Sequence, residues 1–105
     1  MKYRKLVSGD MMPMVGIGTF TLKEEKCRET VEIALEEGYT HIDTAEAYRN
    51  QTEVAKAIRN VGVDRKDLFI TTKVGSGHLK YQDTLDACDT TLRDLETDYI
   101  DLYLI

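Results

Sequence analysis

The chain of 105 residues is 42% hydrophobic and 31% charged, a balance typical of one ordinary globular domain and not of a disordered protein. Nineteen acidic and fourteen basic residues give a formal net charge of -5, without the runs of like charge that favour nucleic acid or acidic membranes. No apolar stretch reaches the roughly 18 residues of a membrane-spanning helix, and residues 1–14 lack the apolar core of a signal peptide. We therefore expect a cytoplasmic protein with no nucleic-acid partner and no membrane partner.

The first elements in chain order are short extended segments at residues 2–6 and 14–20. A turn signal at residues 8–10 separates them, and Pro13 disfavours a helix between them. The pattern predicts an opening hairpin followed by a first strand.

Three helices and three further strands alternate after residue 20. Residues 21–24 match a capping box and predict a first helix that ends at Gly38, while residues 50–53 predict the cap of a second helix. Strands are predicted at residues 39–43, 68–74 and 99–105, and a third helix lies between the last two. The apolar stripes expected to be buried are Cys27, Val31, Ala34 and Leu35 on the first helix and Leu85, Cys88, Leu92 and Leu95 on the third.

Alternating strands and helices indicate βαβ units and a parallel sheet, either an open doubly wound sheet or part of a (β/α)8 barrel. The single proline and the absence of linker composition indicate one domain or part of one. The two cysteines lie far apart without metal-ligand spacing, so we expect them to pack in the core and we predict no metal site.

Chemistry in such sheets lies at the carboxyl ends of the strands. The first strand ends around Gly18 and Thr19, the second ends in Asp43 with Tyr48 five residues later, and the third ends in Lys73. The sequence therefore predicts that a carboxylate, a phenol and an amine converge on one edge of the sheet.

Each of these residues also has an ordinary structural explanation. Asp43 alone is more often a capping residue, Tyr48 a half-buried aromatic, and Lys73 a strand-end lysine that reaches solvent. His41, in mid-strand, is expected to be packed or hydrogen-bonded, and the run 16–18 lacks the third glycine of a dinucleotide fingerprint.

Together the three groups have a clear chemical use. An ammonium next to a phenol favours the phenolate and lowers the pKa of a tyrosine from about 10, and a carboxylate keeps the ammonium charged and in place. Such an Asp/Lys/Tyr relay can protonate a developing alkoxide, which is the step that carbonyl reduction by hydride requires.

Residues 38–45 and 48–51 resemble the signature of the aldo-keto reductase family around its catalytic aspartate and tyrosine. Residues 6–19, 69–73 and 97–105 are similar to the opening hairpin and first strand, the lysine strand and the fourth strand of that family. The resemblance implies an α/β fold, a partial (β/α)8 TIM barrel with an N-terminal hairpin, about four parallel strands and three helices.

The resemblance also implies an oxidoreductase that reduces small aldehydes or ketones with NADPH. Tyr48 would donate the proton, Lys73 would depress the pKa of the tyrosine, and Asp43 would orient the lysine. Gly18, Thr19 and Asp43 would face the nicotinamide end of the cofactor.

A complete barrel takes roughly 250 residues, so residues 1–105 correspond to the N-terminal half of one, with no second domain. The resemblance places the catalytic histidine of the family directly after Ile105, and Gly75-Ser76-Gly77 replaces a bulkier loop residue. We expect this fragment to have little or no activity alone and to self-associate through exposed sheet edges.

Two alternatives stay open at this point. One is a non-catalytic relative that acts as a binding or regulatory subunit, as potassium-channel β subunits do. The other is an inactive folding fragment. The substrate and the choice between NADPH and NADH also stay open.

Overall fold

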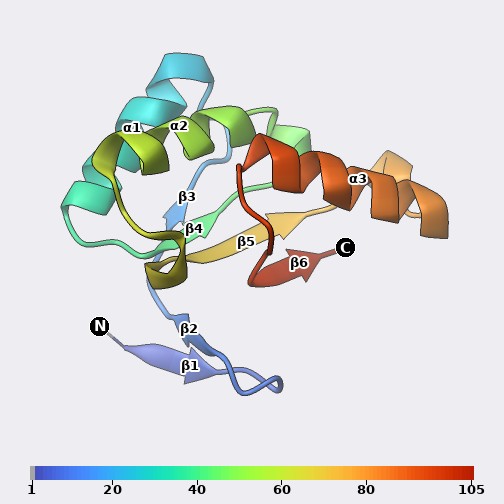
Figure 1. Ribbon diagram of the computed structural model, residues 1–105, viewed down its shortest axis with the longest axis horizontal. Coiled ribbons are helices and arrows are strands. Elements are labelled where there is room, and N and C mark those ends of the chain that lie inside the picture. The colour runs from blue at the N-terminus through green and yellow to red at the C-terminus, as the bar shows by residue number, and fades with distance from the viewer. Residues whose placement is uncertain (1) are drawn as a thin grey trace.

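A computed structural model describes residues 2–105 as a β-hairpin followed by a parallel sheet with three helices (Figure 1). The hairpin strands are β1 (Tyr3–Lys5) and β2 (Met11–Pro13). The sheet strands are β3 (Ile17–Gly18), β4 (His41–Asp43), β5 (Phe69–Lys73) and β6 (Leu102–Leu104). The helices are α1 (Glu24–Glu36), α2 (Gln51–Val61) and α3 (Tyr81–Asp94), with 3-10 turns η1 (Glu46–Tyr48), η2 (Arg65–Asp67) and η3 (Ser76–His78).

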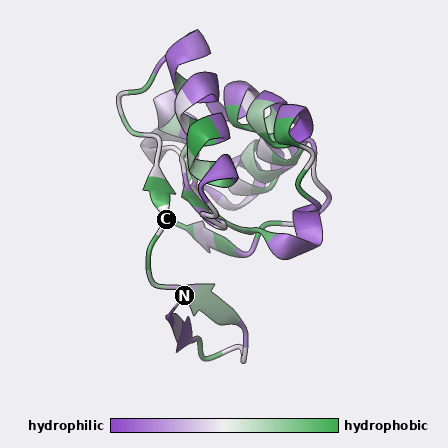
Figure 2. Cartoon of the chain, turned by 90° about the vertical axis from the view of Figure 1, so that its left-hand side faces the viewer, coloured by the Kyte–Doolittle hydropathy of each residue, from purple (hydrophilic) through white to green (hydrophobic). Residues whose placement is uncertain are grey.

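The predicted order of strands and helices is confirmed. The sheet has the order β3-β4-β5-β6 with every neighbouring pair parallel, and β1 and β2 pair antiparallel. All three helices lie on one side of the sheet, and the hairpin lies apart from them at the other side (Figure 1). Figure 2 shows the same separation from a second direction, with hydrophobic and hydrophilic residues alternating along the helices.

The hydrophobic core fills the space between the sheet and the helices. Its buried members come from both layers and include Cys27, Val31, Leu35, Ile42, Val54, Ala57, Leu68, Ile70 and Leu95. Burying one such aliphatic side chain stabilises the fold by about 1.5–3 kcal/mol. This layer therefore fixes how the strand ends are placed.

Side chains of β4 and β5 alternate between the two faces of the sheet, as the period of a strand requires. Ile42 and Ile70 enter the core. His41 and Thr71 are joined on the opposite face, where Nε2 of the imidazole lies 2.9 Å from Oγ1 of the threonine. The last residue of each strand, Asp43 and Lys73, falls on this second face, away from the helices.

The predicted capping box at residues 21–24 is wrong. Helix α1 begins at Glu24, and its N-cap residue Lys23 makes no side-chain capping bond. Thr21 instead has a left-handed backbone with φ of 67°, because the chain turns sharply there before the helix begins.

The predicted buried stripe of α3 is partly wrong. Leu95 is buried, but Leu85 is 45% exposed, and Ala87 and Thr91 are the buried residues within the helix. Gln51 of α2 donates to Thr91 Oγ1 at 3.2 Å, so a polar pair occupies the contact between these helices. Because Gln51 and Thr91 bond to each other, α3 faces the core with a stripe that is partly polar.

Candidate active site

Asp43, Tyr48 and Lys73 meet at the carboxyl edge of the sheet. Asp43 is the last residue of β4, Lys73 is the last residue of β5, and Tyr48 ends the 3-10 turn η1 that follows β4. The ammonium of Lys73 donates to the Asp43 carboxylate and, at 3.3 Å, to the Tyr48 hydroxyl. A third bond of 3.0 Å reaches the carbonyl oxygen of Thr44. One lysine thus joins all three predicted groups.

The surroundings of Lys73 keep its side chain charged. Burial by itself lowers the pKa of this amine, but the hydrogen bonds to Asp43 and Tyr48 outweigh it, so the pKa lies above its ordinary value. The Lys73 and Asp43 side chains remain 30% and 44% exposed. A ligand can therefore reach the ion pair from outside.

Tyr48 is held on more than one side. Its ring lies 5.2 Å from the ring of Phe20, centroid to centroid, in a tilted arrangement. The Lys73 Nζ lies 5.1 Å from the centre of the same ring. Arg49, the next residue, has a left-handed backbone with φ of 57° that ends the turn and leads the chain into α2. The phenol is therefore placed at the edge of the sheet by contacts with both neighbouring strand ends.

A buried polar network supports this edge from below, and the sequence did not reveal it. The Asn50 amide donates to the carbonyl oxygens of Thr19 at 2.8 Å and Leu22 at 2.7 Å. Thr44 donates to the Asn50 side-chain oxygen at 3.2 Å, and Thr19 donates to the Thr44 hydroxyl at 2.8 Å. Asn50, Thr44 and Thr19 are each at most 1% exposed. The network joins the ends of β3 and β4 to the start of α2.

Asn50 was predicted as a helix cap, and it does stand at the N-cap position of α2. Its side chain makes no capping bond there. An asparagine that cross-links three segments and one that caps a helix occupy the same position in the sequence, so position alone did not separate them.

The residues expected to face a nicotinamide are placed differently from one another. Gly18 is exposed, and a Cβ added there would meet open space. Thr19 is fully buried, and its hydroxyl is used within the network beneath the edge. Gly18 and Asp43 are therefore accessible from outside, while Thr19 supports the edge from below.

His41 is packed and hydrogen-bonded, as predicted, although it is the first residue of β4 and does not lie in mid-strand. Its Nδ1 lies 3.1 Å from the carbonyl oxygen of Pro13 in the hairpin, and its ring packs edge-on against Phe69. A Cβ on Gly16 would come within 2.8 Å of the His41 ring and backbone. The glycine is therefore required for close packing of the hairpin connection on β4.

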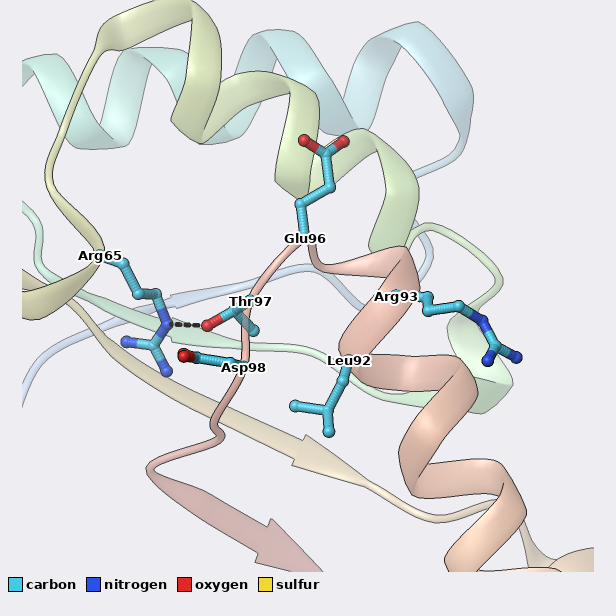
Figure 3. A pocket seen from close by; sticks show the side chains of 6 residues that line it. All are labelled: Arg65, Leu92, Arg93, Glu96, Thr97 and Asp98. Atoms are coloured by element: carbon cyan, nitrogen blue, oxygen red, sulfur yellow. Dashed lines mark hydrogen bonds between the residues drawn. The ribbon is translucent and has the colours of Figure 1, made fainter.

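Figure 3 shows a hollow of about 470 Å³ between the segments that lead into β5 and β6. Its lining residues are Arg65, Leu92, Arg93, Glu96, Thr97 and Asp98. These segments precede their strands, so the hollow lies at the opposite end of the sheet from Lys73. Arg65 there donates to Thr97 at 2.9 Å and to Asp101 at 2.7 Å, which ties the two segments together. We therefore place the candidate site at the other, carboxyl edge.

Within residues 2–105, no three histidine, cysteine or acidic side chains are grouped closely enough to hold a metal ion. Over the same range, none of the helices is long and apolar enough to cross a membrane. Both cysteines are free, and burial, aided by nearby Glu53, raises the pKa of the Cys27 thiol to about 11.

Comparison with known proteins identifies this architecture. Residues 13–105 match the model of the aldo/keto reductase family. An aldo-keto reductase of Mycolicibacterium smegmatis is 46% identical over 100 residues, which are 95% of this chain and 36% of the relative. The glycerol 2-dehydrogenase (NADP(+)) of Saccharomyces cerevisiae is 40% identical over 104 residues, 99% of this chain and 33% of that protein.

A crystal structure of an aldo/keto reductase from Brucella melitensis superposes with a TM-score of 0.95 at 43% identity, covering 99% of this chain and 40% of that one. The chain belongs to the aldo/keto reductase family. The predicted fold is confirmed as part of the barrel of these structures, and the chain spans about a third of the length of the curated relatives that it matches.

Proposed function

We propose that this chain supplies the proton-donating part of an active site that reduces small aldehydes or ketones to alcohols. The observation that carries the proposal is the Lys73 ammonium, which bonds to both the Asp43 carboxylate and the Tyr48 hydroxyl. Membership of the aldo/keto reductase family supports a carbonyl substrate.

In the proposed reaction, the Tyr48 hydroxyl donates its proton to the carbonyl oxygen of the substrate while hydride adds to the carbonyl carbon. The C=O double bond becomes a C–O single bond and the product is the alcohol. The phenolate left on Tyr48 is stabilised by the adjacent Lys73 ammonium, and Asp43 keeps that ammonium charged and oriented. A proton from solvent then restores the phenol.

We further propose NADPH as the hydride source. A bound nicotinamide would supply the hydride, with the Gly18 backbone and the Asp43 carboxylate beside it. The yeast relative is named a glycerol 2-dehydrogenase (NADP(+)), and this supports a cofactor that carries the 2′-phosphate. Thr19 contributes by fixing the end of β3 through its bond to Thr44.

Cofactor titration tests this proposal. NADPH is added to the full-length protein while cofactor fluorescence is followed, with Tyr48→Phe and Lys73→Met as matched variants. Saturable binding that survives Tyr48→Phe supports the site, because that variant removes only a hydroxyl. Absence of binding by the full-length protein at millimolar cofactor would contradict it.

We also propose that residues 1–105 alone have little or no reductase activity and that they self-associate. Only part of a barrel is present, and the two edge strands of the sheet are β3 and β6. Beside these strands, Val15 is 56% exposed, Phe20 is 68% exposed and Ile105 is 95% exposed. Unpaired strand edges with apolar flanks favour association. Light scattering of the isolated chain should give a mass above 12.0 kDa, whereas a stable monomer would contradict self-association.

A further inference from the structure

Tyr48 and Lys73 lie on separate segments, so the distance between them depends on how those segments are joined. Tyr48 is carried by the 3-10 turn η1, and Lys73 is followed by the loop that leads into η3. Apart from the bonds made by Lys73 itself, Glu46 connects the same two segments. It stands at the start of η1, two residues before Tyr48.

The Glu46 carboxylate binds the loop after Lys73 at two points. Its Oε2 accepts a hydrogen bond from the backbone N–H of Gly75 at 2.6 Å, and its Oε1 lies 2.6 Å from Nδ1 of His78. The Glu46 side chain is only 25% exposed, whereas that of His78 is 52% exposed. Bonds from an N–H to a charged carboxylate are shorter and stronger than bonds between neutral groups. Because His78 is the more exposed partner, the contact with Gly75 is more shielded from solvent than the contact with His78.

Gly75 allows this carboxylate to approach. A Cβ built on Gly75 would lie 3.0 Å from Glu46 Oε2 and 3.3 Å from its carboxyl carbon. The Gly75 backbone has φ of -66° and ψ of 145°, a conformation open to any residue. The glycine is thus explained by the space that the carboxylate occupies and not by backbone strain. Gly77, in the same loop, has nothing within 4 Å of its added Cβ.

We infer that Glu46 is a positioning residue, which holds the turn carrying Tyr48 against the loop that follows Lys73. The inference rests on the function proposed above, because it assigns Glu46 the task of keeping the phenol within hydrogen-bond reach of the ammonium. Glu46 itself does not contact the Tyr48 hydroxyl or the Lys73 amine among the bonds of the site. Glu46 therefore influences the distance between Tyr48 and Lys73 through the backbone of η1 and of the loop after Lys73.

Four substitutions in the full-length protein test the inference. Glu46→Ala removes the acceptor, while Glu46→Gln keeps an oxygen that Gly75 N–H can bond. Gly75→Ala pushes the carboxylate away without straining the backbone, and Gly77→Ala is its matched control. Each variant is assayed for aldehyde reduction with NADPH, and the ¹³Cζ signal of Tyr48 is recorded by NMR.

Glu46→Ala should lower kcat about tenfold to hundredfold, since a displacement of about 1 Å near a reacting group has effects of that size. Gly75→Ala should lower kcat less, because its Cβ requires the Glu46 carboxylate to move by only a few tenths of an ångström. The KM for NADPH should stay within about twofold, because the cofactor contacts are unchanged. The Tyr48 signal should move in both variants. Glu46→Gln should restore most of kcat, and Gly77→Ala should match the wild type in both readouts.

Unchanged kcat and an unchanged Tyr48 signal in Glu46→Ala would overturn the inference, as would equal losses in Gly75→Ala and Gly77→Ala. The two proposals fail separately. If Tyr48→Phe retains full activity, the proposed function is wrong, but the NMR signal of Tyr48 in Glu46→Ala still shows whether Glu46 positions the phenol.

Discussion

Residues 43–50 contribute to two regions with opposite character. Asp43 and Tyr48 stand at the half-exposed edge of the sheet, where both bond to Lys73. Thr44 and Asn50, from the same stretch, are buried and bond to each other. One short segment thus provides groups suited to chemistry and groups that hold the strand ends together. Substitutions in the first region should lower turnover with little loss of stability. Substitutions in the second region should lower stability with little loss of turnover.

The largest effect is expected for Lys73→Met, which removes the ammonium but keeps an unbranched side chain. If Lys73 stabilises the phenolate, turnover by the full-length protein should fall about 10²–10⁴-fold. The free energy of unfolding should change by less than about 1 kcal/mol, because the ion pair is partly exposed. Steady-state kinetics and urea unfolding measure the two quantities. Lys56→Met, which removes an exposed lysine paired with Glu53, is the control, and an equal loss of turnover there would refute the assignment.

Substitutions in the buried network should lower stability more than turnover. Asn50→Ala leaves the carbonyl oxygen of Leu22 without its donor and the Thr44 hydroxyl without its Asn50 acceptor, and each unsatisfied buried group costs about 1–3 kcal/mol. We expect a loss of about 3 kcal/mol in urea unfolding. Asn60→Ala, at an exposed asparagine, should change stability by no more than about 0.5 kcal/mol. Similar values for the two variants would remove the distinction between the buried network and the surface.

Two glycines allow a closely packed position to be compared with an open one. Gly16→Ala brings a Cβ within 2.8 Å of the His41 ring and backbone, and overpacking of this kind costs about 1–3 kcal/mol. Gly18→Ala meets open space and should be close to neutral for folding. Thermal unfolding of both variants measures the difference. If Gly16→Ala were as stable as the wild type, close packing against His41 would not require a glycine at this position.

A pH-dependent effect is expected from the Cys27 thiol. The folded-state pKa of the Cys27 thiol is about 11, against 9.0 for an ordinary cysteine, so the unfolded chain loses this proton first as pH rises. Stability should therefore be unaffected by Cys27 below pH 9.0 and should fall between pH 9.0 and about 11. Urea unfolding at pH 7 and pH 10.5 should show a larger loss in the wild type than in Cys27→Ala. Identical losses in the two proteins would show that folding does not raise the pKa of the Cys27 thiol.

The sequence predicted the order of strands and helices and the meeting of Asp43, Tyr48 and Lys73, because both follow from patterns local to each strand. Parallel strands bring their carboxyl ends to one edge, so Asp43 and Lys73 were expected to lie near each other. The register pairs Asp43 with Thr71, and the long Lys73 side chain reaches back to the carboxylate. The catalytic roles of these residues, and the cofactor contacts of Gly18 and Thr19, remain predictions.

What the sequence missed depends on contacts between distant segments. Thr21 matched a capping pattern, but the chain turns there with a left-handed backbone. The inward stripe of α3 runs through Ala87 and Thr91, because Thr91 finds a partner in Gln51 of α2. A hydrophobic pattern favours apolar positions and does not register a buried polar residue that is paired across 40 positions of sequence. The link between Glu46 and Gly75 was invisible for the same reason.

The role of Tyr48 as proton donor is tested by comparing wild type and Tyr48→Phe in the full-length protein, with turnover of an aldehyde and the dissociation constant for NADPH both measured. The substitution removes the proposed proton donor and leaves the ring, its contact with Phe20 and the fold in place. We expect a loss of about 10²–10⁴-fold in kcat with cofactor affinity retained within about twofold. Undiminished kcat in Tyr48→Phe would contradict it.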